Sequence, residues 1–291
     1  MLPPFLGPTL RGAFGYQFRK QNCQTRLQTC EPCFLRSICP YFVVFEGHNP
    51  NPEGILGDYQ RVPQPFVLNV DFQSESDRPN LLQWGITLFG QACKLWPYVV
   101  FAFNEIGKTG LGKQRVKYQL EQCTDCNSGS TIWERGESGK LTGQPVFADV
   151  SARKAVPLGL STIRFAFQTP VRIRSQGLDN LDALSGLDIM LQGQRRHRVF
   201  EECFGTAETG RKPDFIEPEQ FETVHYNLKP WSITRFSGRQ QKKVALQGLY
   251  GEITIRGPWA QTGEWLQAVE AIHLGKSTSF GLGRVSWEVI E

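Results

Sequence analysis

Histidines are the side chains of this chain best suited to acid–base chemistry, because imidazole titrates near neutral pH, and the sequence contains four of them. His273 follows a helical pattern and comes shortly before Lys276, and the negative end of a helix dipole favours protonated histidine. His273 is therefore our first candidate for a general acid. The structural alternative is a helix-terminal histidine that hydrogen-bonds the last carbonyls. The rival is His48, in a loop rich in Asn, Pro and Gly, which could equally be a solvated loop residue.

Four cysteines near the N-terminus have a spacing that suits a metal ion. Cys23, Cys30, Cys33 and Cys39 are separated by six, two and five residues. Four thiolates in one short segment can close a tetrahedral zinc site, and an iron–sulfur cluster needs the same ligands. We predict a structural metal here. The later pair Cys123 and Cys126 is weaker evidence, although it could replace part of this set.

The composition limits the classes of protein to which this chain can belong. The chain has 291 residues, 40% of them hydrophobic and 21% charged, which is typical of a globular protein of about two domains. The longest apolar run, residues 95–103, contains Pro97 and is too short to span a membrane, and the N-terminus does not resemble a signal peptide. We expect a cytoplasmic protein without membrane contact. The net charge of +4 permits nucleic-acid binding without requiring it.

An internal repeat indicates how these residues are positioned. Both halves contain a helical pattern, a glycine-rich loop with Gly-Lys and Gly-Leu-Gly, and a strand-like segment. These segments are residues 96–106, 107–113 and 115–120 in the first half, and residues 266–272, 275–284 and 285–290 in the second half. In the second half a strand at 161–168 and a helical region at about 179–203 come first.

The order of elements predicts an α+β fold of two tandem ferredoxin-like domains, similar to RNA-recognition modules. We place the N-terminal domain, with its Cys-rich insertion, at residues 1–155 and the C-terminal domain at residues 156–291. One feature does not fit, because only eight residues precede the helix that Thr9 is expected to cap. Either the native start lies upstream, which we favour, or the first strand is a shortened edge strand.

Several motifs resemble the RAMP endoribonucleases that mature precursor CRISPR RNA. The motifs are Leu10-Arg11-Gly12-Ala13-Phe14-Gly15, Cys39-Pro40-Tyr41, Phe45-Glu46, Phe167, Thr169-Pro170, Arg172, Arg235-Phe236-Ser237-Gly238-Arg239-Gln240, Gly248, Gly251 and the segment from His273 to Arg284. The resemblance implies a metal-independent cut within a CRISPR repeat, in which the RNA 2′-hydroxyl attacks and leaves a 2′,3′-cyclic phosphate and a 5′-hydroxyl. It implies precursor CRISPR RNA as partner, with other CRISPR effector subunits as further candidates and no DNA.

Under this resemblance, the catalytic candidates are His273, Lys276 and His48, since relatives often use a histidine from the N-terminal domain. Tyr16 could position a phosphate through its phenol, although an ordinary helix residue is the simpler interpretation. His197 lies between arginines and is better interpreted as part of a basic, RNA-facing helix face, and His225 as a core or sheet-surface residue.

The RNA-binding candidates are basic residues and loop glycines. Glycine lets backbone N–H groups approach a phosphate, although a tight turn explains both loops as well. Lys113, Arg115 and Lys117 alternate along the expected strand and would point to one side. The full set is Arg11, Lys108, Lys113, Arg115, Arg195, Arg196, Arg235, Arg239, Lys242, Lys243, Gly275, Gly281, Gly283 and Arg284.

Two other functions stay open. The chain could be a non-cleaving RAMP subunit that holds processed guide RNA in an effector complex. It could also be a metal-stabilised module whose cysteines bind a protein partner. The histidine beside Gly-Lys favours the endoribonuclease, because a purely structural turn does not need both groups.

Overall fold

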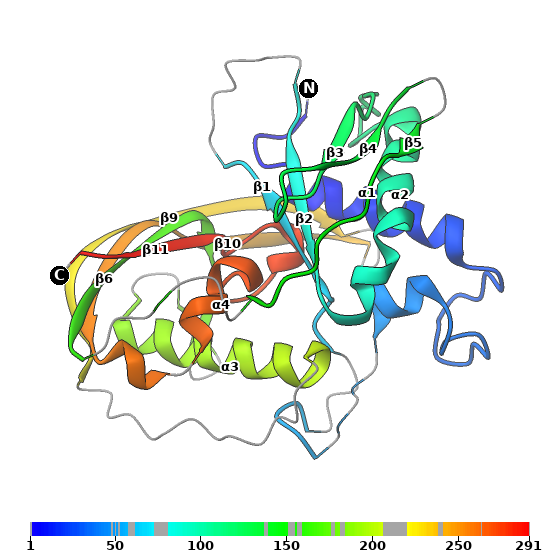
Figure 1. Cartoon of the computed structure of the whole chain (residues 1–291). Helices are drawn as coiled ribbons and strands as arrows, with labels where there is room; N and C mark the ends of the chain where they lie inside the picture. The colour runs from blue at the N-terminus through cyan, green and yellow to red at the C-terminus, as the bar shows by residue number, and fades with distance from the viewer. Residues whose placement is uncertain are drawn as a thin grey trace.

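The computed structural model describes residues 2–47, 49, 51, 53–57, 62–72, 81–136, 139–150, 155, 159–175, 178–180, 184–205, 220–237, 241–262 and 264–290 (Figure 1). Within this part of the chain, no helix is long and apolar enough to cross a membrane.

The second half of the chain forms a complete ferredoxin-like unit. Its elements are β6 (Ser161–Val171), α3 (Gly186–Phe204), β9 (Glu222–Ser237), β10 (Lys242–Gly257), α4 (Trp265–Ile272) and β11 (Val285–Val289). The sheet order is β11-β6-β10-β9, and every neighbouring pair is antiparallel. A short hairpin of β7 (Ile173–Ser175) and β8 (Leu178–Asn180) follows β6. This order confirms the predicted split βαβ topology.

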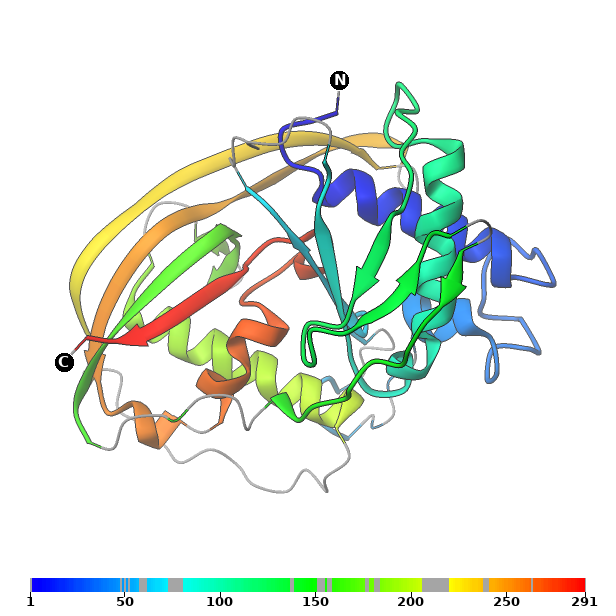
Figure 2. The same ribbon diagram turned by 45° about the horizontal axis from the view of Figure 1, so that its top comes forward.

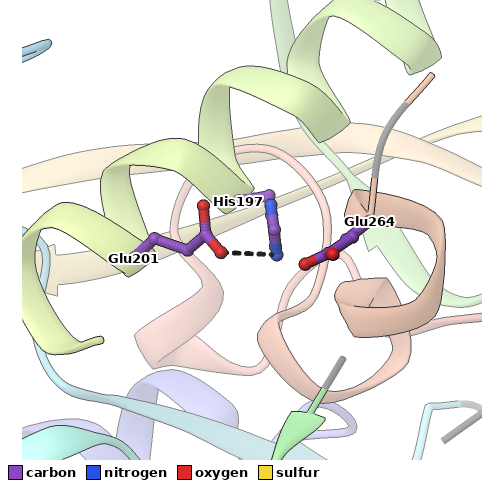
Figure 3. A group of neighbouring side chains, drawn as sticks. All are labelled: His197, Glu201 and Glu264. Atoms are coloured by element: carbon purple, nitrogen blue, oxygen red, sulfur yellow. Dashed lines mark ion pairs between the residues drawn. The ribbon is translucent and has the colours of Figure 1, made fainter. Parts of the chain in front are cut away.

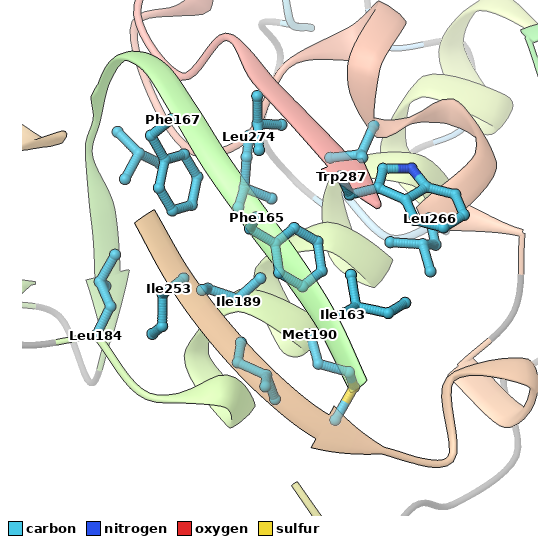
Figure 4. Close-up of a cluster of buried hydrophobic side chains, with 14 of the residues drawn as sticks. Ile163, Phe165, Phe167, Leu184, Ile189, Met190, Ile253, Leu266, Leu274 and Trp287 are labelled. Atoms are coloured by element: carbon cyan, nitrogen blue, oxygen red, sulfur yellow. The ribbon is translucent and has the colours of Figure 1, made fainter. Parts of the chain in front are cut away.

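The core of this unit lies between the sheet and the two helices. Ile163, Phe165 and Phe167 alternate along β6 and are buried, because successive strand residues face opposite sides (Figure 4). Met190 of α3 and Leu266 of α4 belong to the same buried cluster. The apolar face of the sheet therefore holds both helices on one side.

The helix α3 begins later than predicted. Residues 178–180 form β8, and the helix starts at Gly186 behind a capping box in which the Ser185 and Asp188 side chains satisfy each other's backbone N–H groups. The expected helical region at 179–203 was therefore wrong at its start. The spacing of Ser185 and Asp188 is visible in the sequence and predicts the correct start of the helix.

The first half contains the central elements of the same fold, two helices with a β-hairpin between them in the sequence. Its main elements are α1 (Gly7–Asn22), a π-helical turn (Phe42–Glu46), β1 (Phe66–Val70), β2 (Trp84–Leu88), a 3-10 segment (Gly90–Leu95) and α2 (Trp96–Thr109). β1 and β2 pair as an antiparallel hairpin, and α1 packs on α2. Leu10, Phe14 and Phe18 form the buried stripe of α1.

The start of this half differs from the prediction. The helix α1 begins at Gly7, with Pro8 in its first turn, so Thr9 lies inside the helix and does not cap it. Within residues 2–47, no strand precedes α1.

The strand predicted at 115–120 was wrong. Leu111 and Val116 form an isolated bridge, and Gly110, Gly112 and Arg115 all have positive φ angles. The chain therefore curls back on itself and cannot extend along β2. A small separate sheet follows, made of β3 (Gln122–Thr124), β4 (Thr131–Glu134) and β5 (Lys140–Leu141).

The two halves are joined by the long β9–β10 hairpin, which extends from the C-terminal sheet across the N-terminal half (Figures 1 and 2). Leu246, Trp231 and Ile233 pack with the core of the first half, and Trp231 makes an edge contact with Phe5 at 5.4 Å between ring centroids. The α+β class is confirmed. The boundary between residues 155 and 156 stays a prediction, because residues 151–154 and 156–158 lie outside the described part.

Candidate functional site

A cavity of about 360 Å³ opens where the two halves meet. The N-terminal half contributes the end of the π-helical turn and the segment before β1, and the C-terminal half contributes α3 and the glycine-rich loop. Its lining residues are Phe45, Glu46, Val62, Pro63, Gln64, Arg196, Gly275, Lys276, Ser277, Thr278 and Ser279. Segments far apart in sequence therefore form one polar site.

Arg196 forms the inner wall of this cavity. Its guanidinium donates hydrogen bonds to the carbonyl oxygens of Ile272 and His273 at 2.8 and 2.7 Å, and to Thr278 Oγ1 at 2.7 Å. It also lies over the Phe200 ring, 4.4 Å from the centroid. Burial lowers the pKa of Arg196 to about 9. Within the described residues, no carboxylate pairs with it.

Two more arginines lie beside the cavity and share one aromatic ring. Arg11 lies 5.8 Å and Arg235 lies 4.4 Å from the centroid of Phe280, which directly follows the lining residue Ser279. Arg11 also donates to Gln64 Oε1 at 3.1 Å and stacks on Phe45 at 4.5 Å.

In the described part of the chain, no carboxylate forms an ion pair with either member of this pair. Burial, together with the neighbouring Arg235 cation, lowers the pKa of Arg11 to about 10, while Glu46 acts in the opposite direction. Arg235 Nε is buried and has no hydrogen-bond partner in the described part of the chain. A partly buried cation without an ion-pair partner is stabilised when an anion joins it.

The glycines of the C-terminal loop have a packing role. Gly275, Gly281 and Gly283 all have positive φ angles, and a Cβ at Gly283 would lie 1.8 Å from the Leu274 carbonyl oxygen. The turn interpretation is therefore correct for this loop. Its effect is to present the exposed Lys276, whose backbone N–H donates to the Arg172 carbonyl at 2.8 Å, at the cavity.

His273 is inside the protein. The side chain is completely buried at the end of α4, where Nδ1 lies 3.2 Å from the Leu282 carbonyl oxygen and Nε2 lies 3.0 Å from Asn69 Oδ1. Burial lowers the pKa of His273 to about 3, and the Leu282 bond opposes this only partly. The expectation that the helix dipole keeps His273 protonated is therefore wrong, because desolvation dominates. The histidine instead links the glycine-rich loop to β1.

We expect His273 to make folding pH-dependent. Its pKa lies near 3 in the folded state and near 6.5 in the unfolded state, so below pH 6.5 the unfolded state binds a proton that the folded state does not. The free energy of unfolding should therefore fall from pH 7 towards pH 4, by up to about 1.4 kcal/mol per pH unit from this group. Urea unfolding of wild type and His273→Gln at pH 7 and pH 5 measures it. Equal losses in both proteins would contradict this assignment.

The other histidines have different positions. His197 is buried on the face of α3 towards α4, so its place in an RNA-facing helix face was wrong. His225 is exposed on β9, in agreement with the sheet-surface interpretation. His48 lies outside the described residues, and follows the cavity residue Glu46 by two positions in the sequence.

The remaining candidates lie on the surface or outside the described part. Tyr16 is 74% exposed and does not line the cavity. Lys108 pairs with Glu105, and Arg284 Nη1 lies 3.8 Å from Asp71 Oδ1. Arg239 lies outside the described residues. Further exposed residues are Lys113, Arg115, Lys117, Arg195, Lys242 and Lys243. The first three are not alternate residues of a strand, as predicted, because the chain turns at Arg115.

The four N-terminal cysteines line a common pocket of about 300 Å³. Their sulfur atoms do not form a compact cluster. Among the described residues, no three cysteine sulfur atoms all lie within 4.8 Å of one another. This arrangement does not support the predicted zinc or iron–sulfur site. Cys123 is partly buried and Cys126 is exposed, both at the small sheet.

Sequence reasoning missed several residues of this site, including Gln64, Phe280 and Thr278. Phe280 lies in the motif that carried the resemblance and is an aromatic residue among glycines and serines, which was the available signal. Gln64 had no signal, because only the fold brings it to Arg11.

Comparison with known proteins assigns each half. Residues 1–146 match the AF_1859_N family model, an N-terminal domain, and residues 165–285 match the model of the CRISPR-associated endoribonuclease Cas6. A protein of Archaeoglobus fulgidus is 30% identical over 135 residues, which cover 46% of this chain and 44% of that protein. The match thus spans less than half of the relative.

Two solved structures share the arrangement of both halves. The product complex of Cas6 (TTHB231) has a TM-score of 0.55 at 13% identity and covers 99% of this chain and 96% of its own. Thermus thermophilus Cas6 (TTHB231) has a TM-score of 0.51 at 12% identity, with 99% and 93% covered. At such identities the likeness establishes the fold. The chain belongs to the AF_1859_N family by the match over its N-terminal half, and its C-terminal half is similar to the Cas6 endoribonuclease family.

Proposed function

We propose that this chain is a metal-independent endoribonuclease that cuts precursor CRISPR RNA within the repeat and supplies guide RNAs for antiviral defence. The observation that carries the proposal is the cavity between the halves, with Arg11, Arg196 and Arg235 around it and no carboxylate paired with any of them in the described residues. Three such guanidiniums suit a phosphodiester backbone, because they supply charge and planar donors together.

The reaction needs little beyond positioning and proton transfer. A base removes the 2′-hydroxyl proton, the 2′-oxygen attacks the adjacent phosphorus, and the bond to the 5′-oxygen breaks as that oxygen gains a proton. The products are a 2′,3′-cyclic phosphate and a 5′-hydroxyl. Lys276 at the cavity and the nearby arginines would stabilise the extra negative charge of the phosphorane.

His48 is the candidate for the proton-transfer step. The ring of His273 is completely buried and its two nitrogens face groups of the protein, which argues against contact with RNA. His48 is the histidine that remains near cavity residues in sequence, since Phe45 and Glu46 precede it. Tyr16 is given no role, because it is exposed away from the lining.

We expect Arg235→Ala to weaken binding of a repeat RNA about 10-fold and to reduce the salt dependence of log K by about one unit, because one phosphate contact is lost. Fluorescence anisotropy at several salt concentrations measures both quantities. Arg164→Ala is the matched control, since Arg164 is on the same sheet and already pairs with Glu288. Equal affinities of Arg235→Ala and wild type would remove this arginine from the RNA site.

The second candidate is a non-cleaving RAMP subunit that holds guide RNA. The buried position of His273 keeps this alternative relevant, because it removes one of the two histidines proposed for catalysis. RNA cleavage assayed in excess EDTA distinguishes the two functions.

A further inference from the structure

Outside the cavity, α3 and α4 bring a histidine and two glutamates together. Gly193, His197 and Glu201 are four residues apart and share the face of α3 towards α4. A Cβ at Gly193 would lie 2.2 Å from the Trp265 ring, so glycine is needed for α4 to start this close to α3. Glu264 directly precedes Trp265 and is thereby placed opposite His197.

The three side chains converge on one point (Figure 3). One ligand atom from each of His197, Glu201 and Glu264 can be chosen so that all lie within 4.8 Å of one another. His197 Nε2 lies 3.7 Å from Glu201 Oε1, which is an ion-pair separation and longer than a hydrogen bond. The histidine is 8% exposed, whereas Glu264 is exposed, so the group is open to solvent on one side.

The negative charge of the two carboxylates in this group is not balanced by a lysine or arginine in the described part of the chain. In the described part of the chain, no lysine or arginine forms an ion pair with Glu201 or Glu264, and the His197 ring forms no hydrogen bond. Asp149 adds negative potential at His197. An imidazole nitrogen beside carboxylate oxygens is a donor set that divalent metal ions bind.

We propose that His197, Glu201 and Glu264 bind one divalent transition-metal ion that ties α3 to the start of α4. An imidazole nitrogen and two carboxylates form a ligand set that suits Mn²⁺ or Zn²⁺, with water completing the coordination. Metal–ligand bonds of about 2.0–2.2 Å require the ligand atoms to come roughly 3 Å apart, and rotation of the two glutamates achieves this. None of the three residues lines the RNA cavity, so the role is structural.

The test uses Mn²⁺, because hard cations prefer oxygen and nitrogen ligands to the thiolates of the eight cysteines. Titration of the full chain, followed by the EPR signal of free Mn²⁺, should give one bound ion. Glu264→Gln and Glu201→Gln should each weaken binding at least about 10-fold, as expected when a ligand is lost. Both positions are at least partly exposed, so the fold should persist, and circular dichroism checks it. Glu222→Gln, exposed on β9, should bind as wild type does.

Two results would overturn the proposal. One is the lack of Mn²⁺ binding by wild type at millimolar concentration. The other is unchanged binding in both glutamine variants. RNA cleavage by these variants in EDTA is measured in parallel and should equal that of wild type, so failure of the metal site and failure of the endoribonuclease are separate outcomes.

Discussion

Substitution of His48 by alanine should lower the single-turnover rate of repeat cleavage by about 10²- to 10⁴-fold, the usual contribution of a general acid or base. Affinity for the repeat RNA and the melting temperature should stay near wild-type values, because the change removes one imidazole from a segment rich in Asn, Pro and Gly. Gel analysis of a labelled repeat under enzyme excess measures the rate.

The control for this experiment is His225→Ala, since His225 is exposed on β9 and has no proposed role. Its cleavage rate should equal that of wild type. If His48→Ala cleaves at the wild-type rate, His48 is not the proton-transfer residue and the catalytic assignment is wrong.

Substitution of His273 by alanine should act on stability instead. The change leaves a cavity and removes the imidazole that lies between the Leu282 carbonyl oxygen and Asn69 Oδ1, where the two halves meet. The free energy of unfolding should fall by about 2–4 kcal/mol, from the combined cost of the cavity and the lost hydrogen bonding of the ring. Urea unfolding monitored by circular dichroism measures this loss.

Cleavage distinguishes the structural role of His273 from a catalytic one. At a temperature where His273→Ala is still folded, its cleavage rate should stay within a few-fold of wild type. A variant with wild-type stability and no cleavage would restore His273 as the general acid, because only a catalytic role predicts that combination.

The second half was predictable because its sequence is locally consistent. The apolar alternation of residues 161–168 and the helical pattern of residues 266–272 agree with the periods of a strand and a helix, and the structure has β6 and α4 there. The first half was less predictable. The repeat suggested a last strand at 115–120, but the positive φ of Arg115 and the local bridge from Leu111 to Val116 depend on tertiary packing and have no reliable sequence signal.

The candidate site likewise contains residues that the sequence predicted and residues that it did not. Arg11, Arg235 and Lys276 were predicted from charge and motif, and the fold brings them to one region. The role of His273 was mispredicted because helix-end position was used without burial, and desolvation outweighs a helix dipole. The cluster of His197 with Glu264 could not be predicted, since the two residues are 67 positions apart and meet where α3 packs on α4, close to the approach of Gly193 to Trp265.

The most direct test of the proposed endoribonuclease activity is incubation of the purified chain with an end-labelled CRISPR repeat RNA in excess EDTA, followed by mapping of both new ends. We expect a single cut within the repeat that leaves a 2′,3′-cyclic phosphate and a 5′-hydroxyl. Tight binding without any cut, or a cut that requires an added divalent metal ion, would contradict it.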